Sequence, residues 1–168
     1  MMTIIGSKDT FAIEYEMTDS DYGWMEIWVN NRTVCSYLWR DKKFHFWGHV
    51  KLLVEWFSDS IEAILNETEF PLAVNATSSI DFESKCRRLP SDDWADARWN
   101  WYISHTWYYL HEDSPLPLVY FRRVENKIEI EWDESDLYDG PVFDNPKGLE
   151  FVDVQTFSEV IHKFIESF

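Results

Sequence analysis

The chain has 168 residues, of which 45% are hydrophobic and 27% are charged. This composition excludes a disordered chain, and no stretch approaches the roughly 20 apolar residues that a membrane-spanning helix needs. The 31 acidic and 15 basic residues give a net charge of −16 at pH 7, which disfavours nucleic acid and anionic membranes as direct partners and favours a basic protein.

The length fits a single domain over residues 1–168, because no repeat or Pro/Gly/Ser-rich linker divides the sequence. The opening "MMTIIGSKDTF" lacks the basic and apolar segments of a secretory signal, so we expect a cytoplasmic protein, monomeric by default. Cys35 and Cys86 form neither a zinc nor a disulfide pattern. Cys86 lies in "SKCRR", and basic neighbours of this kind can lower the pKa of a thiol.

Three segments near the N-terminus have the composition of strands. "FAIEYEM" (11–17) alternates apolar and polar residues with the period of two that predicts a strand with one wet face. "WMEIWVN" (24–30) and "TVCSYLW" (33–39) follow after turn residues. The first 39 residues therefore predict a three-stranded antiparallel meander.

A helix is expected after the meander. Apolar residues recur at 46, 50, 53, 57, 61 and 64, which predicts a helix over 46–65 with one stripe packed on a sheet. Beyond it, "PLAVN" (71–75) is a candidate short strand. Residues 76–93 contain few apolar side chains and are predicted to form a loop.

The stretch "LVYFRRVENKIEIEW" (118–132) predicts a hairpin that turns at Glu125 and Asn126, where Asn tolerates a positive φ. With Val124 opposite Lys127, Arg122 faces Glu129, and we interpret the pair as a cross-strand ion pair. The opposite face of the hairpin carries Val119, Phe121, Ile128, Ile130 and Trp132.

The chain closes with a predicted amphipathic helix over 154–168, for which Asp153 is the expected N-cap. The order of elements indicates an α+β fold. In this fold the N-terminal meander and the C-terminal hairpin form an antiparallel sheet, and two main helices pack on it.

The segment "WADARWNWYISHTWYYLHED" (94–113) holds four tryptophans and three tyrosines between acidic residues. Helical spacing and strand alternation fit it about equally from Tyr102 onward, and about half of its rings are expected in the core. Exposed tryptophans beside carboxylates suit the docking of a cationic protein, because rings hold a complex and charge steers the encounter. The candidate partner-binding residues here are Asp92, Asp93, Trp94, Asp96 and Trp99.

A second candidate surface is the acidic segment "DESDLYDGPVFDNP" (133–146), since long loops in compact domains are often functional. It departs from a calcium-binding loop because Leu137 stands at the fifth position. A solvated acidic turn is the alternative to partner contact. The candidate partner-binding residues are Asp133, Glu134, Asp136, Tyr138 and Asp139.

The sequence contains no G-x-S-x-G motif and no glycine-rich phosphate loop. We therefore expect a non-enzymatic protein with no catalytic residues, no metal and no cofactor. His105 and His111, in the ring-rich segment, are interpreted as buried and hydrogen-bonded rather than as general bases.

"IIGSKDTFAIEYEM", followed by "YGWMEIWVNNRTV", resembles the opening of predicted immunity proteins of bacterial polymorphic toxin systems, in which a similar Ile-Gly-x-Lys-x-x-Phe-Ala-Ile-Glu-Tyr motif starts the chain. "LPLVYFRRVENKIEIEWD" and the closing helix are similar to the C-terminal half of uncharacterised bacterial proteins of the same kind of system. The first resemblance covers about the first 40 residues, and the middle of the chain resembles no known family.

These resemblances imply a cytosolic antidote that binds the toxin domain of a delivered effector, as in contact-dependent growth inhibition. It would block the toxin by covering its active site or a nearby surface, and many such toxins are nucleases with basic faces. The alternatives are an acidic, aromatic-rich module that binds a small ligand or another protein, and, less consistent with the residues, a hydrolase.

Overall fold

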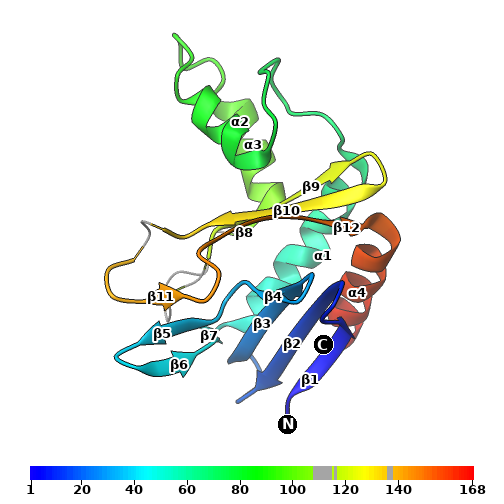
Figure 1. Cartoon of the computed structure of the whole chain (residues 1–168). Helices are drawn as coiled ribbons and strands as arrows, with labels where there is room; N and C mark the ends of the chain where they lie inside the picture. The colour runs from blue at the N-terminus through cyan, green and yellow to red at the C-terminus, as the bar shows by residue number, and fades with distance from the viewer. Residues whose placement is uncertain (108–114, 116, 136–137) are drawn as a thin grey trace.

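The computed structural model describes residues 1–107, 115, 117–135 and 138–168, and these residues form an α+β fold (Figure 1). The N-terminal sheet is antiparallel, and its strands follow the order β1-β2-β3-β4, with β7 also paired to β3. The strands are β1 (Thr3–Ser7), β2 (Phe11–Met17), β3 (Gly23–Val29), β4 (Arg32–Thr33) and β7 (Phe46–Gly48).

The first two predicted strands are confirmed as β2 and β3, but the prediction of one continuous third strand over 33–39 is wrong. After Thr33 the backbone leaves the N-terminal sheet: the Val34 N–H still donates to the Ile27 carbonyl of β3 at 3.0 Å, but the Glu26 side chain also accepts backbone hydrogen bonds here. Glu26 Oε1 accepts the N–H groups of Val34 at 3.0 Å and Cys35 at 2.6 Å. The chain then enters a separate small sheet.

We call this small sheet the β-arm. It consists of β5 (Tyr37–Trp39), β6 (Lys42–Phe44) and β11 (Val142–Phe143), with β5 in the middle. In Figure 1 it extends from one end of the molecule, beside β7. The predicted loop over 133–146 therefore contributes a strand, β11, which joins the N-terminal and C-terminal parts of the chain.

The C-terminal sheet has the order β12-β10-β9-β8. Its strands are β8 (Thr106–Trp107), β9 (Val119–Val124), β10 (Lys127–Asp133) and β12 (Lys147–Asp153). The predicted hairpin register is confirmed, with Val124 opposite Lys127 and Arg122 opposite Glu129. At the turn, Glu125 adopts the left-handed conformation (φ 52°), whereas the sequence indicated Asn126.

The two main predicted helices are confirmed as α1 (Val50–Asn66) and α4 (Val154–Glu166). Helix α1 begins later than predicted because residues 46–48 pair with β3, and the His49 side chain then accepts the Leu52 N–H. Asp153 precedes α4 as expected, but its side chain makes no capping hydrogen bond and pairs with Lys127 instead.

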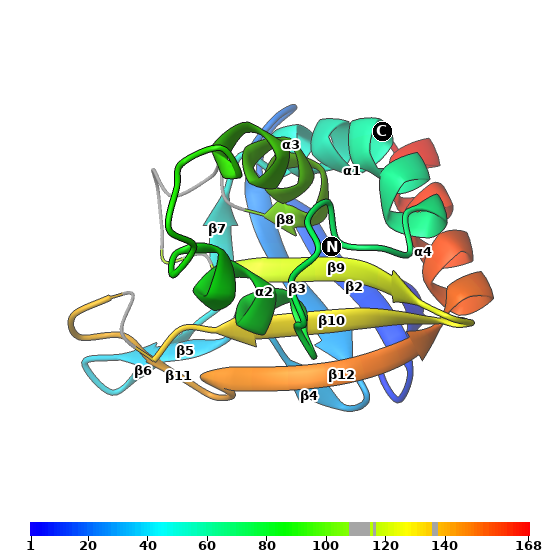
Figure 2. The same cartoon turned by 90° about the horizontal axis from the view of Figure 1, so that it is seen from above.

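Two further helices, α2 (Ser79–Cys86) and α3 (Ala95–His105), lie on the C-terminal sheet (Figure 2). The prediction of loop over 76–93 is wrong for α2, and the candidate strand over 71–75 does not form. In its described part, up to Trp107, the ring-rich segment forms a helix as far as His105 followed by a two-residue strand; residues 108–113 lie outside the described residues.

The main core lies between the N-terminal sheet, one face of the C-terminal sheet and helices α1 and α4. The Phe57 ring centroid is 5.6 Å from that of Phe121 and 6.3 Å from that of Phe164. Burying a side chain of this size stabilises a fold by about 1.5–3 kcal/mol. All five side chains predicted on the apolar face of the hairpin are buried: Val119, Phe121, Ile128, Ile130 and Trp132.

A second, separate cluster of buried rings joins α2 and α3 to the other face of the C-terminal sheet. The Phe70 and Phe82 rings stack at 4.4 Å, and Trp101 meets Phe82 edge-on at 5.1 Å. We call residues 67–105 the α2–α3 lobe. Within the described residues, no helix combines the length and the apolar character needed to cross a bilayer.

Candidate functional site

The α2–α3 lobe is positioned by carboxylates on β10. Glu129 accepts hydrogen bonds from the Ser79 backbone N–H at 3.0 Å and from its hydroxyl at 2.7 Å. Arg122 Nη2 donates to the same carboxylate at 2.7 Å, which confirms the predicted cross-strand ion pair. Glu131 accepts from the Ser78 hydroxyl at 2.9 Å and the Ile80 N–H at 2.8 Å.

These bonds satisfy the free N–H groups at the start of α2 and explain why a segment with so few apolar residues is helical. Burial raises the pKa of Glu131, whereas the donors from Ser78 and Ile80 act in the opposite direction. The hairpin face that carries Arg122 and Glu129 is thus covered by α2 rather than exposed to solvent.

Helix α3 is attached to α2 by an ion pair. The Arg98 guanidinium donates to Glu83, with an Nε–Oε2 distance of 2.7 Å, and lies 4.4 Å from the centre of the Tyr102 ring. Behind it, the Trp56 indole of α1 donates to the Ile103 carbonyl at 2.9 Å. The α2–α3 lobe is therefore held by β10 on one side and by α1 on the other.

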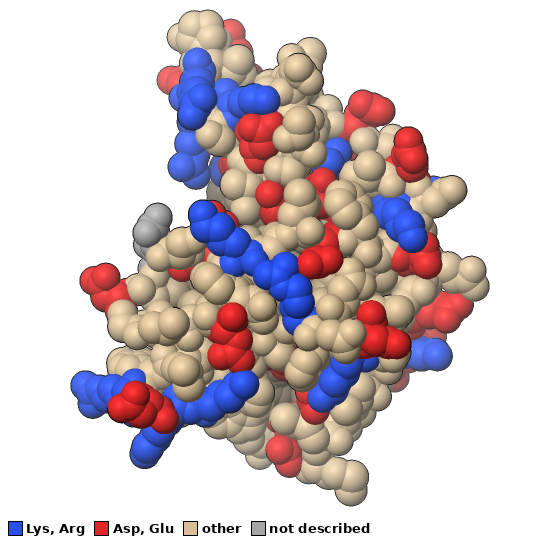
Figure 3. Space-filling model, viewed as in Figure 1, with Lys and Arg blue, Asp and Glu red and all other residues tan. Residues whose placement is uncertain are grey.

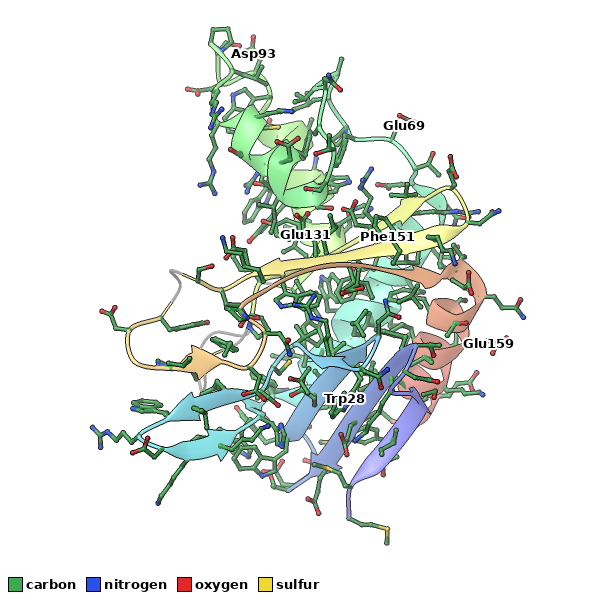
Figure 4. The ribbon with its side chains drawn as sticks, viewed as in Figure 1. Trp28, Glu69, Asp93, Glu131, Phe151 and Glu159 are labelled. Carbon is green, nitrogen blue, oxygen red and sulfur yellow. The ribbon has the colours of Figure 1, made fainter. Side chains whose placement is uncertain are left out.

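Four of the five residues predicted at 92–99 are exposed at the outer part of the lobe: Asp92, Asp93, Asp96 and Trp99. Figure 4 shows Asp93 at the far end of the lobe. Trp99 is 45% exposed, whereas Trp94 is half-buried and its indole nitrogen lacks a hydrogen-bond partner. The exposed Arg87 and Arg88 give the lobe both signs of charge, which Figure 3 also shows.

The ring-rich segment divides between core and surface, as expected for its described part. Trp101, Tyr102 and Trp107 are buried, and Trp99 is exposed. Burial lowers the pKa of His105 to about 4, so this imidazole is neutral at pH 7, and its Nδ1 lies 2.8 Å from the Trp101 carbonyl. The interpretation of His105 as a buried, hydrogen-bonded histidine is confirmed; His111 lies outside the described residues.

An acidic face of α1 lies beside α3, and sequence reasoning missed it. Glu55, Asp59 and Glu62 follow the i, i+4, i+7 spacing of one helix face, and all three are exposed. No Lys, Arg or His occurs between Lys51 and Lys85. The signal was in the sequence, because the same periodicity that predicted the buried stripe of α1 leaves these carboxylates on its outer side.

The residues of the second predicted surface, in the segment 133–146, differ in how far they are exposed. Asp133 pairs with Lys147 at 3.2 Å. The half-buried Tyr138 lies 6.3 Å from the Phe143 ring, and Asp139 is exposed. Asp136 lies outside the described residues.

The prediction that Glu134 contacts a partner is wrong for this conformation, because its side chain is only 4% exposed. Desolvation, with the nearby carboxylates of Glu26 and Asp133, raises the pKa of Glu134 to about 10. A protonated carboxyl can be buried where a charged one cannot. The acidic composition of the loop gave no sign of this burial.

The β-arm exposes apolar side chains that sequence reasoning placed inside a sheet. Leu38 is 44% exposed, its cross-strand neighbour Val142 is 65% exposed, and Trp39 is 43% exposed. The hairpin that joins β5 to β6 is basic, and the cations at the outer end of the arm are visible in Figure 3. These cations are Arg40, Lys42 and Lys43.

A buried polar cluster at the root of the β-arm contains Glu26, Ser36 and His45. Both the Ser36 hydroxyl, at 3.0 Å, and the Glu26 carboxylate, at 3.3 Å, approach the same imidazole nitrogen, Nδ1. A nucleophilic triad needs them on opposite nitrogens, so this geometry does not activate the serine. The hydrogen bond to Glu26 raises the pKa of His45.

Neither cysteine has the environment of a reactive thiol. Both are buried, and desolvation raises the pKa of Cys86 and that of Cys35. The basic neighbours of Cys86 in the sequence therefore do not lower the pKa of its thiol. Glu83 opposes ionisation of this thiol more strongly than Arg98 favours it.

Three tryptophans lie half-buried on the outer face of the N-terminal sheet: Trp24, Trp28 and Trp47. Lys8 Nζ lies 4.3 Å from the centre of the Trp28 ring, whose indole donates to Glu14 at 2.8 Å (Figure 4). Tyr22 stacks on Trp47 at 5.5 Å. Because other side chains already cover these rings, they do not form an open stacking platform for a sugar or a base.

Within the part of the chain that the structure describes, no group of three or more His, Cys, Asp or Glu side chains is arranged to hold a metal ion. No protein-family model, curated protein or solved structure matches this chain.

Proposed function

We propose that this chain is an immunity protein that binds a cognate basic toxin domain, of which a nuclease fits best, and neutralises it by direct contact. The observation that carries the proposal is the side of the molecule where α1 meets α3. There, Glu55, Asp59 and Glu62 are exposed with no ion pair among the described residues, close to a helix that exposes Asp96 and Trp99.

Charge and aromatic content support different steps of such an association. Uncompensated carboxylates raise the rate at which a cationic partner arrives, and this attraction weakens as salt rises. A well-packed tryptophan mainly slows dissociation, because a few aromatic contacts carry much of the binding energy. We define the α1–α3 surface by Glu55, Asp59, Glu62, Asp96 and Trp99.

The cytoplasm is the compartment in which this protection would act, because a delivered toxin domain reaches its target there. The basic β-arm is less suited to a cationic partner than the α1–α3 surface. We therefore place toxin contact on the α1–α3 surface and the exposed part of the α2–α3 lobe, including Asp92 and Asp93.

The test is co-expression with a basic domain encoded beside this gene. We expect a one-to-one complex on purification and protection of growth. The variant that neutralises Glu55→Gln, Asp59→Asn and Glu62→Gln should lower the association rate at least about tenfold at low salt. Trp99→Ala should mainly raise the dissociation rate.

The matched control neutralises three exposed carboxylates elsewhere: Glu125→Gln, Glu159→Gln and Glu166→Gln. It changes the net charge by the same amount and should leave the association rate within about threefold of wild type, because screening limits the reach of distant charges. Equal effects of the two triple variants would contradict this surface. Failure of every neighbouring basic domain to bind would contradict the function itself.

A further inference from the structure

We propose that the burial of Glu134, in the segment that Asp144 joins to Ser36 by a backbone hydrogen bond, is proton-coupled: this region opens locally as Glu134 ionises while the rest of the molecule stays folded. We call the buried region around Glu134 the Glu134 contact. The inference concerns the chain alone and does not depend on any partner.

The geometry sets Glu134 apart from the other buried carboxylates. Both of its carboxyl oxygens are buried and have no hydrogen-bond partner among the described residues. By contrast, Glu26, which lies nearby, accepts the N–H groups of Ile27, Val34 and Cys35 and the hydroxyl of Ser36. An ionised carboxylate without donors is strongly disfavoured in such a place, so the buried position selects the protonated form.

Within the described part of the chain, the charged groups that act on Glu134 oppose its ionisation, and the cations of the neighbouring segments already have partners. Glu26 faces it from β3 and Asp133 from the end of β10, and the Cys35 thiol is close enough for its own pKa to be raised by Glu134. The nearby cations have other partners. His45 bonds to Glu26, Lys147 pairs with Asp133, and Lys43 pairs with Asp144.

The direction of the pH dependence follows from the raised pKa. In the closed form the pKa of Glu134 is raised from 4.5 to about 10, whereas in an open, hydrated form it returns toward the ordinary value. Between these two values the open form has released a proton that the closed form keeps. Opening therefore becomes more favourable as pH rises, by up to about tenfold for each pH unit.

The attachments around Glu134 lie in one short segment, 133–146, which the Asn145 amide also joins to the Thr33 carbonyl at 3.0 Å and Asp144 to Lys43 by an ion pair. The Glu134 N–H donates to the Pro146 carbonyl at 2.8 Å, and the Asp144 N–H donates to the Ser36 carbonyl at 2.9 Å. The strand between them, β11, contains only two residues. Short, edge-located pairings of this kind open at lower free energy than a central sheet.

Cys35 provides the reporter, because its thiol is fully buried beside the Glu134 contact. In a Cys86→Ala background, the rate at which a small aromatic disulfide labels Cys35 measures opening. Thiolate formation alone raises this rate about tenfold per pH unit below the pKa of a free thiol. For the otherwise wild-type chain we expect about a hundredfold rise per pH unit between about pH 6 and 8, because Glu134 adds its own tenfold factor.

Glu134→Gln should label more slowly at pH 7 and should show only the tenfold rise, since glutamine does not ionise. Asp139→Asn, an exposed change nearby in the sequence, should behave like wild type. Equal pH slopes for wild type and Glu134→Gln would overturn the proposal. If Glu134→Gln fails to fold, the wild-type slope decides alone, and a rise of only about tenfold per pH unit overturns it.

A urea series separates local opening from global unfolding. Local opening exposes little surface, so labelling at low urea should rise only weakly with denaturant. A labelling rate that follows global unfolding at every urea concentration would show that Glu134 opens only with the whole molecule, and would contradict the inference.

Discussion

Five glutamates are buried among the described residues: Glu26, Glu83, Glu129, Glu131 and Glu134. The first four meet backbone, hydroxyl or guanidinium donors, and all four connect separate parts of the fold. Glu26 binds the chain where it leaves the N-terminal sheet, Glu129 and Glu131 attach α2 to β10, and Glu83 attaches α3 to α2. A strongly acidic composition is thus partly structural rather than a property of the surface alone.

Glu129 gives the first stability prediction. Glu129→Gln should lower the free energy of unfolding by about 3–5 kcal/mol, because it removes the hydrogen-bonded counter-charge of the buried Arg122 guanidinium. The double variant Arg122→Met with Glu129→Leu should recover part of this loss, since neither position of the pair then carries a charge. Urea denaturation at pH 7 measures both, and a loss below about 1 kcal/mol for Glu129→Gln would show that the pair is not effectively buried.

The sequence predicted side chains well where neighbouring strands determine their positions. The hairpin register placed Arg122 opposite Glu129 because a period of two leaves only one arrangement with the apolar face buried. The sequence did not predict the burial of Glu134, because the 133–146 segment is placed by long-range contacts such as the hydrogen bond from the Asp144 N–H to the Ser36 carbonyl. Among the predicted site residues, exposure supports Asp92, Asp93, Asp96, Trp99 and Asp139.

At the scale of elements, the strongest periodic segments were predicted and the weakest were not. Helices α1 and α4 have continuous apolar stripes, whereas α2 depends on carboxylates more than 40 positions further along the chain. Strand β12 was missed for a similar reason. Its position is set by antiparallel pairing with β10. Its apolar residues Leu149 and Phe151 are exposed, so its own sequence does not indicate which face of the strand is buried.

The separation of the two ring clusters predicts that the α2–α3 lobe opens on its own. Phe82→Ala removes a fully buried ring from the lobe, and a core deletion of this size costs about 3–5 kcal/mol. In native-state hydrogen exchange, the amides of α2 and α3 should then lose protection while those of β2, β3 and α1 keep theirs.

Phe157→Ala in the main core is the matched control and should lower protection throughout the molecule. A uniform loss of protection with Phe82→Ala would show that the two clusters form one cooperative unit.

At the scale of the whole molecule, carboxylates in some regions pair with cations and those in other regions do not. Cations that pair with carboxylates lie mainly at the sheets and within the α2–α3 lobe, whereas the 33 residues that separate Lys51 from Lys85 contain no basic side chain. The outer face of α1 is therefore a region of negative potential beside an exposed indole. This combination, rather than the total charge, is the basis of our proposal that the chain binds a basic protein.

The most direct measurement is the association rate of the purified protein with a neighbouring basic toxin domain, recorded from about 0.05 to 0.5 M salt, a range over which screening lengths fall severalfold. Electrostatic steering through Glu55, Asp59 and Glu62 predicts a fall of about a hundredfold in the association rate, with the dissociation rate nearly constant. An association rate that does not depend on salt would contradict the account.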